Sequence, residues 1–147
     1  MTRAELLDRL DVLLGGRVAE ELVFGDISTG AQDDLQRATD MARHMVARYG
    51  MSETLGLATF EAPRQALFLN VPSMAQREYS EDTARRIDAE IERLLESAHG
   101  RVRETLKAKQ EVLTSLAKLL IEKEVVSKAD LDALLASTAA SPPPAPR

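Results

Sequence analysis

Two adjacent aspartates, Asp33 and Asp34, are the residues whose type and position most strongly suggest chemistry. They lie near the start of the segment 28–50, whose apolar residues recur at steps of three and four, the period of a helix with one apolar face. The same steps from Asp33 reach only polar residues: Arg37, Asp40 and His44. The steps from Asp34 reach only apolar residues: Ala38, Met41 and Met45. Asp33 is therefore predicted to face solvent and Asp34 to lie along the apolar face.

A carboxylate on an apolar face needs compensation for the water it loses. When buried, such a group must be ion-paired, hydrogen-bonded, protonated or bound to a metal ion. The spacing leaves two interpretations of Asp34 open. It is a metal ligand, or it is an ordinary acid of a first helical turn that interacts favourably with the helix dipole and accepts backbone N–H groups.

Other metal-binding residue types are scarce in this sequence. It contains no cysteine, which excludes disulfides and thiolate zinc sites within the chain, and two histidines, His44 and His99. Neither histidine has a second histidine four residues away, so neither belongs to a helical two-histidine motif. Both are therefore predicted to face solvent.

The helix that carries the aspartates has predicted ends. Thr29 and Gln32 have the spacing of a capping box, in which the hydroxyl accepts a backbone N–H and the amide side chain reaches back to the cap. Gly50 is predicted to end the helix in a left-handed conformation. These two signals define the element that positions Asp34.

Apolar periodicity predicts four further helices. They span residues 2–24, 80–109, 111–122 and a short stretch that begins at Ser127 or Lys128. Within the first, Gly15 and Gly16 each cost up to about 1 kcal/mol relative to alanine. Two explanations of this pair remain open: close passage of another backbone, or a kink between two shorter helices.

The fold class is predicted to be mainly α, an array of about five helices with a short two-stranded β ribbon. The ribbon is predicted from two short runs with few charges, Leu55–Phe60 and Ala66–Val71. One domain is predicted over residues 2–136. The remaining residues, 137–147, contain four of the six prolines and are predicted to form a disordered tail.

Charge and hydropathy exclude two classes of partner. The 147 residues carry a formal net charge of −5 with a pI near 5.1, whereas a nucleic-acid surface requires clustered Lys and Arg. No apolar run approaches the roughly 18 residues of a membrane-spanning helix. The chain is therefore expected to be soluble by itself, with no membrane segment and no nucleic-acid partner.

Four stretches in order carry a resemblance to a known family. They are LLGGRVAEELVFG at 13–25, STGAQDDLQRAT at 28–39, ARHMVARYGMS at 42–52 and YSEDTARRID at 79–88. Together they resemble the C-terminal part of the peptidase domain of the FtsH family, the membrane-anchored, ATP-dependent zinc metalloproteases of peptidase family M41. The resemblance covers nearly the whole chain, from Thr2 to Leu135.

The resemblance implies a metal-binding role for Asp34. In that family, two histidines of an H-E-x-x-H helix and an aspartate of a T-G-A-x-N-D-L segment hold the zinc. Asp34 aligns with this aspartate, while Asp33 stands where the family usually has asparagine. The sequence contains no H-E-x-x-H motif and no G-x-x-x-x-G-K-[ST] loop for ATP. No catalytic residue is assigned to this chain, because the general-base glutamate of H-E-x-x-H is absent. Zinc is expected only in the complete peptidase domain, and ATP is expected to bind to a domain outside this chain.

The resemblance therefore predicts the C-terminal segment of an ATP-dependent zinc metalloprotease peptidase domain. The segment would supply Asp34 and helices that pack in a hexamer, which degrades protein substrates on the cytoplasmic side of a membrane. The isolated chain is predicted to be inactive because H-E-x-x-H is absent. The alternative is a non-catalytic helical assembly module derived from that family.

Overall fold

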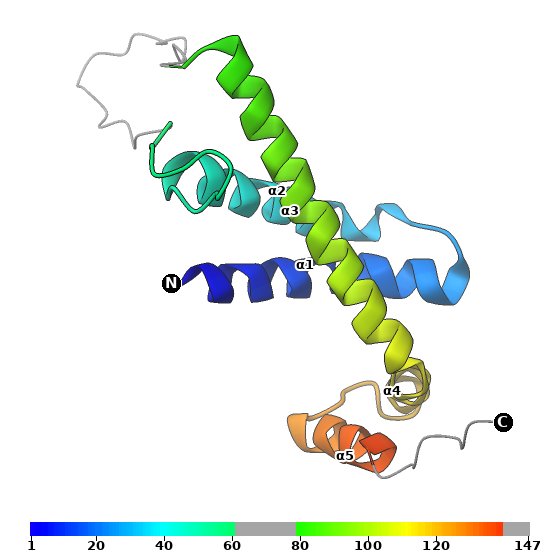
Figure 1. Ribbon diagram of the computed structural model, residues 1–147. Helices are drawn as coiled ribbons and strands as arrows, with labels where there is room; N and C mark the ends of the chain where they lie inside the picture. The colour runs from blue at the N-terminus through cyan, green and yellow to red at the C-terminus, as the bar shows by residue number, and fades with distance from the viewer. Residues whose placement is uncertain (61–78, 140–147) are drawn as a thin grey trace, which may run out of the picture. The chain divides into compact units, whose positions relative to one another are not determined.

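The computed structural model describes residues 1–60 and 79–139, and within these residues the chain is helical and contains no strand (Figure 1). The elements in order are α1 Arg3–Phe24, η1 Thr29–Ala31, α2 Gln32–Arg43, η2 His44–Arg48, α3 Glu81–Ala108, α4 Gln110–Lys123 and α5 Lys128–Ala139. The η1 element is a 3-10 turn and η2 a π-helical turn. The predicted mainly α class with five helices is confirmed. The predicted bounds of α1, α3 and α4 agree with the structure to within one residue.

The chain divides into two compact units, Met1–Arg103 and Glu104 onward. In the first unit, α1 and α2 run antiparallel, and α3 crosses them (Figure 1). Their apolar stripes meet in a core built from side chains at steps of three and four, among them Leu6, Leu10, Leu14, Ala38, Ala42, Met45, Ile87, Ile91, Leu94 and Ala98. Burial of these stripes holds the first unit together.

The start of α1 is fixed by the residues that its sequence predicted. The Thr2 hydroxyl accepts the N–H of Glu5 at 3.2 Å, and the Glu5 carboxylate accepts the N–H of Thr2 at 2.6 Å, which completes a capping box. Gly25 ends the helix with a φ of 68°. Gly15 and Gly16 lie inside this uninterrupted helix, so the explanation by two shorter helices is wrong. Within the described part of the chain, no other segment passes close to either glycine.

The helix that carries the two aspartates begins differently from the prediction. Ser28, not Thr29, caps it, because the Ser28 hydroxyl accepts the N–H of Gly30 at 3.1 Å. The 3-10 turn η1 follows, and α2 then begins at Gln32 without a side-chain cap of its own. After η2 the chain turns at Gly50 with a φ of 60°, in the predicted left-handed conformation.

The first predicted strand, Leu55–Phe60, is wrong, because the chain forms turns there. The Ser52 hydroxyl accepts the N–H groups of Thr54 and Leu55, both at 3.2 Å, and thereby folds the backbone back on itself. The N–H of Phe60 then donates to the Ala47 carbonyl at 2.7 Å instead of to a ribbon partner. The second predicted strand, Ala66–Val71, lies outside the described residues.

In the second unit, α4 and α5 pack against each other. The predicted cap Ser127 begins α5: its hydroxyl accepts the N–H of Asp130, and the Asp130 carboxylate accepts the N–H of Ser127, both at 3.2 Å. The second of these bonds holds the pKa of Asp130 below its usual value. The helix continues through residues 137–139 of the predicted tail, and residues 140–147 lie outside the described part. None of the helices that the structure describes combines the length and apolarity needed to cross a membrane.

Candidate metal-ligand site

The two aspartates lie in the first turn of α2 and differ in exposure as predicted. Asp33 is exposed, whereas Asp34 is half-buried. The residues that follow Asp34 on its face are Ala38 and Met45, which are 0% and 1% exposed, and the half-buried Met41. The helical periodicity thus identified the side of α2 that carries Asp34.

The carboxylate of Asp34 has no hydrogen bond or ion pair to any residue in the part of the chain that the structure describes. Nor do residues 1–60 and 79–139 contain a group of three His, Cys, Asp or Glu side chains placed to hold a metal ion. A carboxylate oxygen is a normal zinc ligand, but zinc sites in proteins use at least three protein ligands. Asp34 therefore fits one position of a zinc site and leaves the others to residues outside this set.

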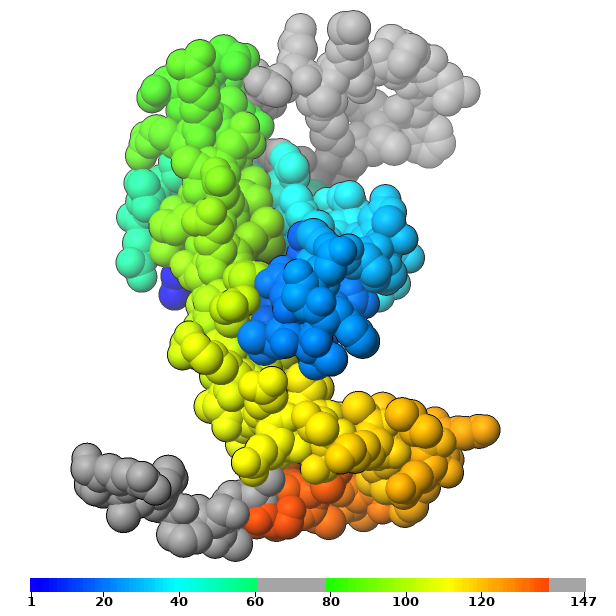
Figure 2. Space-filling model, turned by 90° about the vertical axis from the view of Figure 1, so that its right-hand side faces the viewer, coloured from blue at the N-terminus to red at the C-terminus, as the bar shows by residue number. Residues whose placement is uncertain are grey.

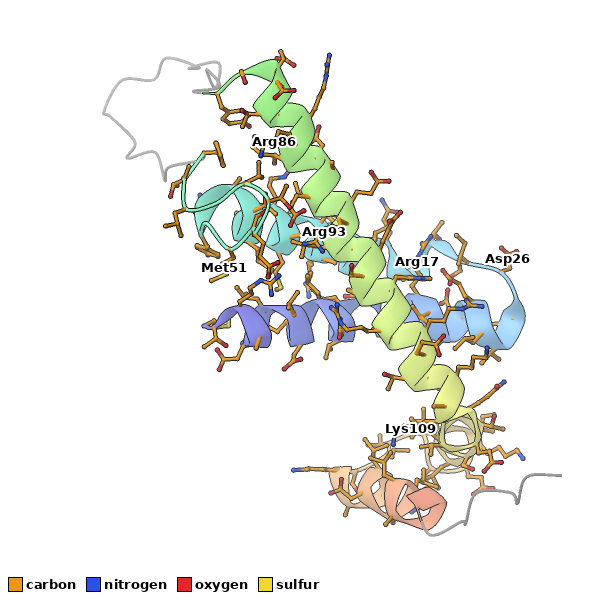
Figure 3. The ribbon with its side chains drawn as sticks, viewed as in Figure 1. Arg17, Asp26, Met51, Arg86, Arg93 and Lys109 are labelled. Atoms are coloured by element: carbon orange, nitrogen blue, oxygen red, sulfur yellow. The ribbon has the colours of Figure 1, made fainter. Side chains whose placement is uncertain are left out.

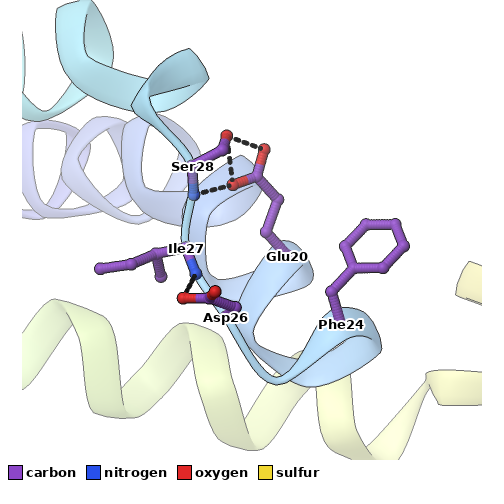
Figure 4. Close-up of a pocket in the computed structure, with 5 residues that line it drawn as sticks. All are labelled: Glu20, Phe24, Asp26, Ile27 and Ser28. Atoms are coloured by element: carbon purple, nitrogen blue, oxygen red, sulfur yellow. Dashed lines mark hydrogen bonds between the residues drawn. The ribbon is translucent and has the colours of Figure 1, made fainter.

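Glu20 of α1 anchors the turn that leads to Asp34 (Figure 4). Its carboxylate accepts the backbone N–H of Ser28 at 3.2 Å and the Ser28 hydroxyl at 3.0 and 3.1 Å. A side chain at Gly30 would place its Cβ 3.2 Å from this hydroxyl, so glycine suits the close approach. The Glu20–Ser28–Gly30 contacts, here called the clasp, tie the start of α2 to the end of α1.

Sequence reasoning missed the clasp because it joins residues on two sides of a helix end. The usable signal was the serine at position 28, immediately before Thr29, since serine is a stronger cap residue than threonine. Beside the clasp lies an open hollow of about 280 Å³, lined by Glu20, Phe24, Asp26, Ile27 and Ser28 (Figure 4).

The carboxylate of the neighbouring Glu21 lies close to three basic groups, one on α1 and two on α3. Its carboxylate lies 2.9 Å from His99 Nε2, 3.7 Å from Arg17 Nε and 3.8 Å from a terminal nitrogen of Arg103. The prediction that His99 faces solvent holds in part: this histidine is half-buried, with 37% of its side chain exposed and its Nε2 against Glu21. His44 is also half-buried, with its ring centroid 6.3 Å from that of Tyr49.

A second carboxylate, Glu90 of α3, is buried and fully engaged. Its side chain is 4% exposed and accepts two bonds from Arg93, at 2.7 and 2.8 Å, and one from the Thr54 hydroxyl at 3.5 Å. The Arg93 bonds, with help from the Ser52 and Thr54 hydroxyls, hold the pKa of Glu90 below its usual value although burial opposes this. Arg86, on the same helix, donates to the Thr54 carbonyl at 3.0 Å (Figure 3).

Sequence reasoning also missed Glu90. The available signal was its place on the apolar stripe of α3, next to Ile91 and three residues after Ile87, with Arg93 three residues further on. These contacts fasten the turn after Met51 to α3. They satisfy Glu90 within the chain, so this carboxylate is a structural element and not a metal ligand.

The sequence matches the profile of peptidase family M41 over residues 1–134. It is 56% identical over 149 aligned positions to an ATP-dependent zinc metalloprotease FtsH of Ralstonia pickettii, with 99% of this chain and 21% of that protein covered. It is 59% identical over 133 positions to the protein of the same name from Syntrophobacter fumaroxidans, with 89% and 20% covered.

A eukaryotic protein matches as well. The mitochondrial inner membrane m-AAA protease component AFG3L1 of Mus musculus is 46% identical over 134 positions, with 91% of this chain and 16% of that protein covered. The chain thus spans about a fifth of the length of the curated relatives that it matches.

Proposed function

Since this chain belongs to peptidase family M41, we propose that it is the C-terminal segment of a zinc-dependent peptidase domain and supplies Asp34 as the third zinc ligand. The observation that carries this proposal is the half-buried Asp34 carboxylate, which no side chain or backbone group within the described residues engages. A half-buried carboxylate that accepts no bond from its own chain keeps its oxygen lone pairs available to a cation. The matched relatives include proteins named as zinc metalloproteases.

The chain's own part in such a site is to present one oxygen ligand in a fixed place. The clasp fixes the start of α2, and the packed face of α2 behind Asp34 limits the motion of the helix. Zinc, when bound, lowers the pKa of a coordinated water so that hydroxide is available near neutral pH. Ligands held rigidly by packing and hydrogen bonds preserve the geometry that this chemistry requires.

The isolated chain is proposed to be inactive, because its sequence has no H-E-x-x-H motif to supply two histidine ligands and a general base. In the longer protein, ATP would bind to a different domain, and the helices of this chain would help to pack a hexamer that degrades protein substrates. By resemblance to the FtsH family, that assembly is proposed to lie on the cytoplasmic side of a membrane.

The test is zinc-dependent cleavage of casein by this chain, by a longer polypeptide that includes the H-E-x-x-H helix, and by that polypeptide with Asp34→Ala. We expect activity only in the unsubstituted longer form, and loss of both bound zinc and cleavage on substitution. Asp33→Ala is the matched control, because Asp33 is in the same helical turn but exposed, and it should retain zinc.

Two outcomes would overturn the proposal. Cleavage by the short chain would mean that it contains a complete active site, in which Asp34 is not the third zinc ligand beside an H-E-x-x-H motif. Absence of activity in the longer form, with folding and self-association intact, would favour the non-catalytic assembly module.

A further inference from the structure

Arg48, in the π-helical turn η2, carries a charge that the described residues do not compensate. Its side chain is half-buried, and among the buried side-chain nitrogens and oxygens of residues 1–60 and 79–139 its Nε is the one without a hydrogen-bond partner. No carboxylate in this part of the chain forms an ion pair with its guanidinium. A buried donor without an acceptor is costly, so an acceptor from outside these residues is expected.

The turn that carries Arg48 also has an unusual backbone. η2 is π-helical over His44–Arg48, and the N–H of Tyr49 donates to the His44 carbonyl at 2.9 Å. Single π-helical turns of this kind are frequent at functional sites. The same spacing brings the rings of His44 and Tyr49 together, with their centroids 6.3 Å apart, and leaves Tyr49 51% exposed. The π turn thus presents an aromatic ring at the surface one residue after the uncompensated arginine.

An exposed apolar residue of the following turn extends this surface. Leu57 is 95% exposed, and its Cα would lie 3.6 Å from a Cβ added at Gly50, so the two backbone segments are in contact. The Thr59 hydroxyl donates to the Arg48 carbonyl at 3.5 Å and joins the same two segments. In Figure 2 the segment that ends at residue 60, in teal, reaches the surface beside α3. Arg48, Tyr49 and Leu57, here called the arginine patch, combine one cation with an exposed aromatic and an exposed aliphatic side chain.

The charged residues of the surrounding sequence are all basic. Residues 41–52 contain Arg43, His44 and Arg48 but no aspartate or glutamate. The next acid along the chain, Glu53, lies 4.0 Å from Arg3 of α1. A guanidinium binds a carboxylate through two parallel N–H donors, which fixes the geometry as well as the charge. The partner that complements this surface is therefore anionic and partly apolar.

We propose that the arginine patch binds an extended peptide through an aspartate or glutamate side chain, with apolar neighbours of that residue on Tyr49 and Leu57. The carboxylate supplies the acceptor that Nε of Arg48 lacks, which a purely apolar peptide would not. The patch lies roughly 20 Å from Asp34 along the axis of α2 and η2, given a rise of about 1.5 Å per residue. Peptide binding there does not require a zinc ion at Asp34, so the inference does not rest on the proposed function.

The test is fluorescence anisotropy of the 147-residue chain with a labelled hexapeptide that carries one glutamate between leucines and has both ends blocked. We expect this peptide to bind about fivefold more tightly than the same peptide with glutamine, because the charged acceptor strengthens the hydrogen bonds to Arg48. EDTA is present throughout, so the result is independent of zinc. Equal affinity for the two peptides, or tighter binding of a peptide whose sole carboxylate is its C-terminus, would overturn the inference.

Substitutions then assign the preference for glutamate to Arg48. Arg48→Gln should abolish it, and Arg48→Lys should restore only part of it, because an ammonium group lacks the planar pair of donors. Arg43→Gln is the matched control, since Arg43 is an exposed arginine one turn earlier, and it should keep the preference. Circular dichroism checks that the helix content of each variant is unchanged. A preference that survives in Arg48→Gln would overturn the inference.

Leu57→Ala tests the apolar part of the patch without disturbing the core, because the side chain of Leu57 is exposed. It should weaken both the glutamate and the glutamine peptide by a similar factor of about three, since it removes apolar contact area and leaves the cation in place. Unchanged affinity for both peptides would contradict the role assigned to Leu57.

Discussion

Two carboxylates on different helices of the first unit differ in burial and in the hydrogen bonds that they accept. Glu90 on α3 is 4% exposed and accepts bonds from Arg93 and Thr54. Asp34 on α2 is half-buried and accepts none from the residues that the structure describes. Both lie on apolar faces of amphipathic helices, so their positions in the sequence pattern are similar.

This difference distinguishes a carboxylate that stabilises the fold from one whose oxygen atoms remain available to a ligand. A buried carboxylate whose donors come from its own chain already has its charge compensated and contributes to stability. A partly buried carboxylate with no donor contributes little to stability and retains its oxygen lone pairs for a cation. Glu90 should therefore be needed for stability, and Asp34 should not.

Removal of the Glu90 carboxylate should have the largest effect on stability. Glu90→Ala deletes charge-assisted hydrogen bonds to Arg93 and leaves the Ser52 and Thr54 hydroxyls without their acceptor, which should lower the free energy of unfolding by about 2–3 kcal/mol. Urea denaturation followed by circular dichroism measures this. Glu92→Ala, on an exposed position of the same helix, should change stability by less than about 0.5 kcal/mol. Equal losses in the two variants would mean that the buried Glu90 contributes no more to stability than an exposed glutamate of the same helix.

The Glu90 contribution should also depend on pH. The folded-state pKa of Glu90 is lowered, chiefly by its bonds to Arg93, so its stabilising effect is fully present above the pKa of the unfolded chain. That effect is lost as the pH falls through the lowered folded-state pKa. The difference in urea midpoint between the unsubstituted chain and Glu90→Gln should therefore be constant near neutral pH and shrink in acid. A difference that stays constant down to pH about 3 would mean that the carboxylate charge is not what stabilises the turn.

Local sequence signals predicted the helices well and the tertiary contacts poorly. Thr2, Ser127 and the apolar stripes fixed helix positions, because caps and periodicity act within a few residues. The run Leu55–Phe60 was mistaken for a strand because its low charge outweighed the turn chemistry of Ser52, whose hydroxyl bonds two backbone N–H groups. Periodicity also placed Asp34 on the apolar side of α2, while its proposed role as a ligand came from family resemblance.

The clasp and the Glu90 contacts were not predictable from local pattern. Glu20 bonds Ser28 across the end of a helix, and Glu90 meets Thr54 from 36 positions away. Such contacts depend on how helices pack, and a single sequence does not specify the packing. Glu90 nevertheless stood on an apolar stripe, and a carboxylate there predicts a partner even where the partner cannot be named.

Loss of the cap at Ser28 should have an intermediate effect. Ser28→Ala removes the acceptor of the Gly30 N–H and the hydroxyl that Glu20 binds, which should cost about 1 kcal/mol of unfolding free energy. Ser28→Thr keeps the hydroxyl and should recover most of that loss. Amide exchange at Gly30 should accelerate in Ser28→Ala but not in the threonine variant. Unchanged exchange in both variants would show that the clasp does not hold the turn that precedes Asp34.

Substitution of Asp34 should have the smallest effect on stability, although it is proposed to have the largest effect on zinc binding. Asp34→Asn in the isolated chain removes a charge that accepts no bond from the described residues, so unfolding free energy should change by no more than about 0.5 kcal/mol. Asp33→Asn is the matched control, because both aspartates lie in the first turn and lose the same favourable interaction with the helix dipole. Similar values for the two variants would leave Asp34 without a structural role in the isolated chain. A clearly larger loss for Asp34→Asn would instead identify it as an ordinary capping acid and remove the contrast with Glu90.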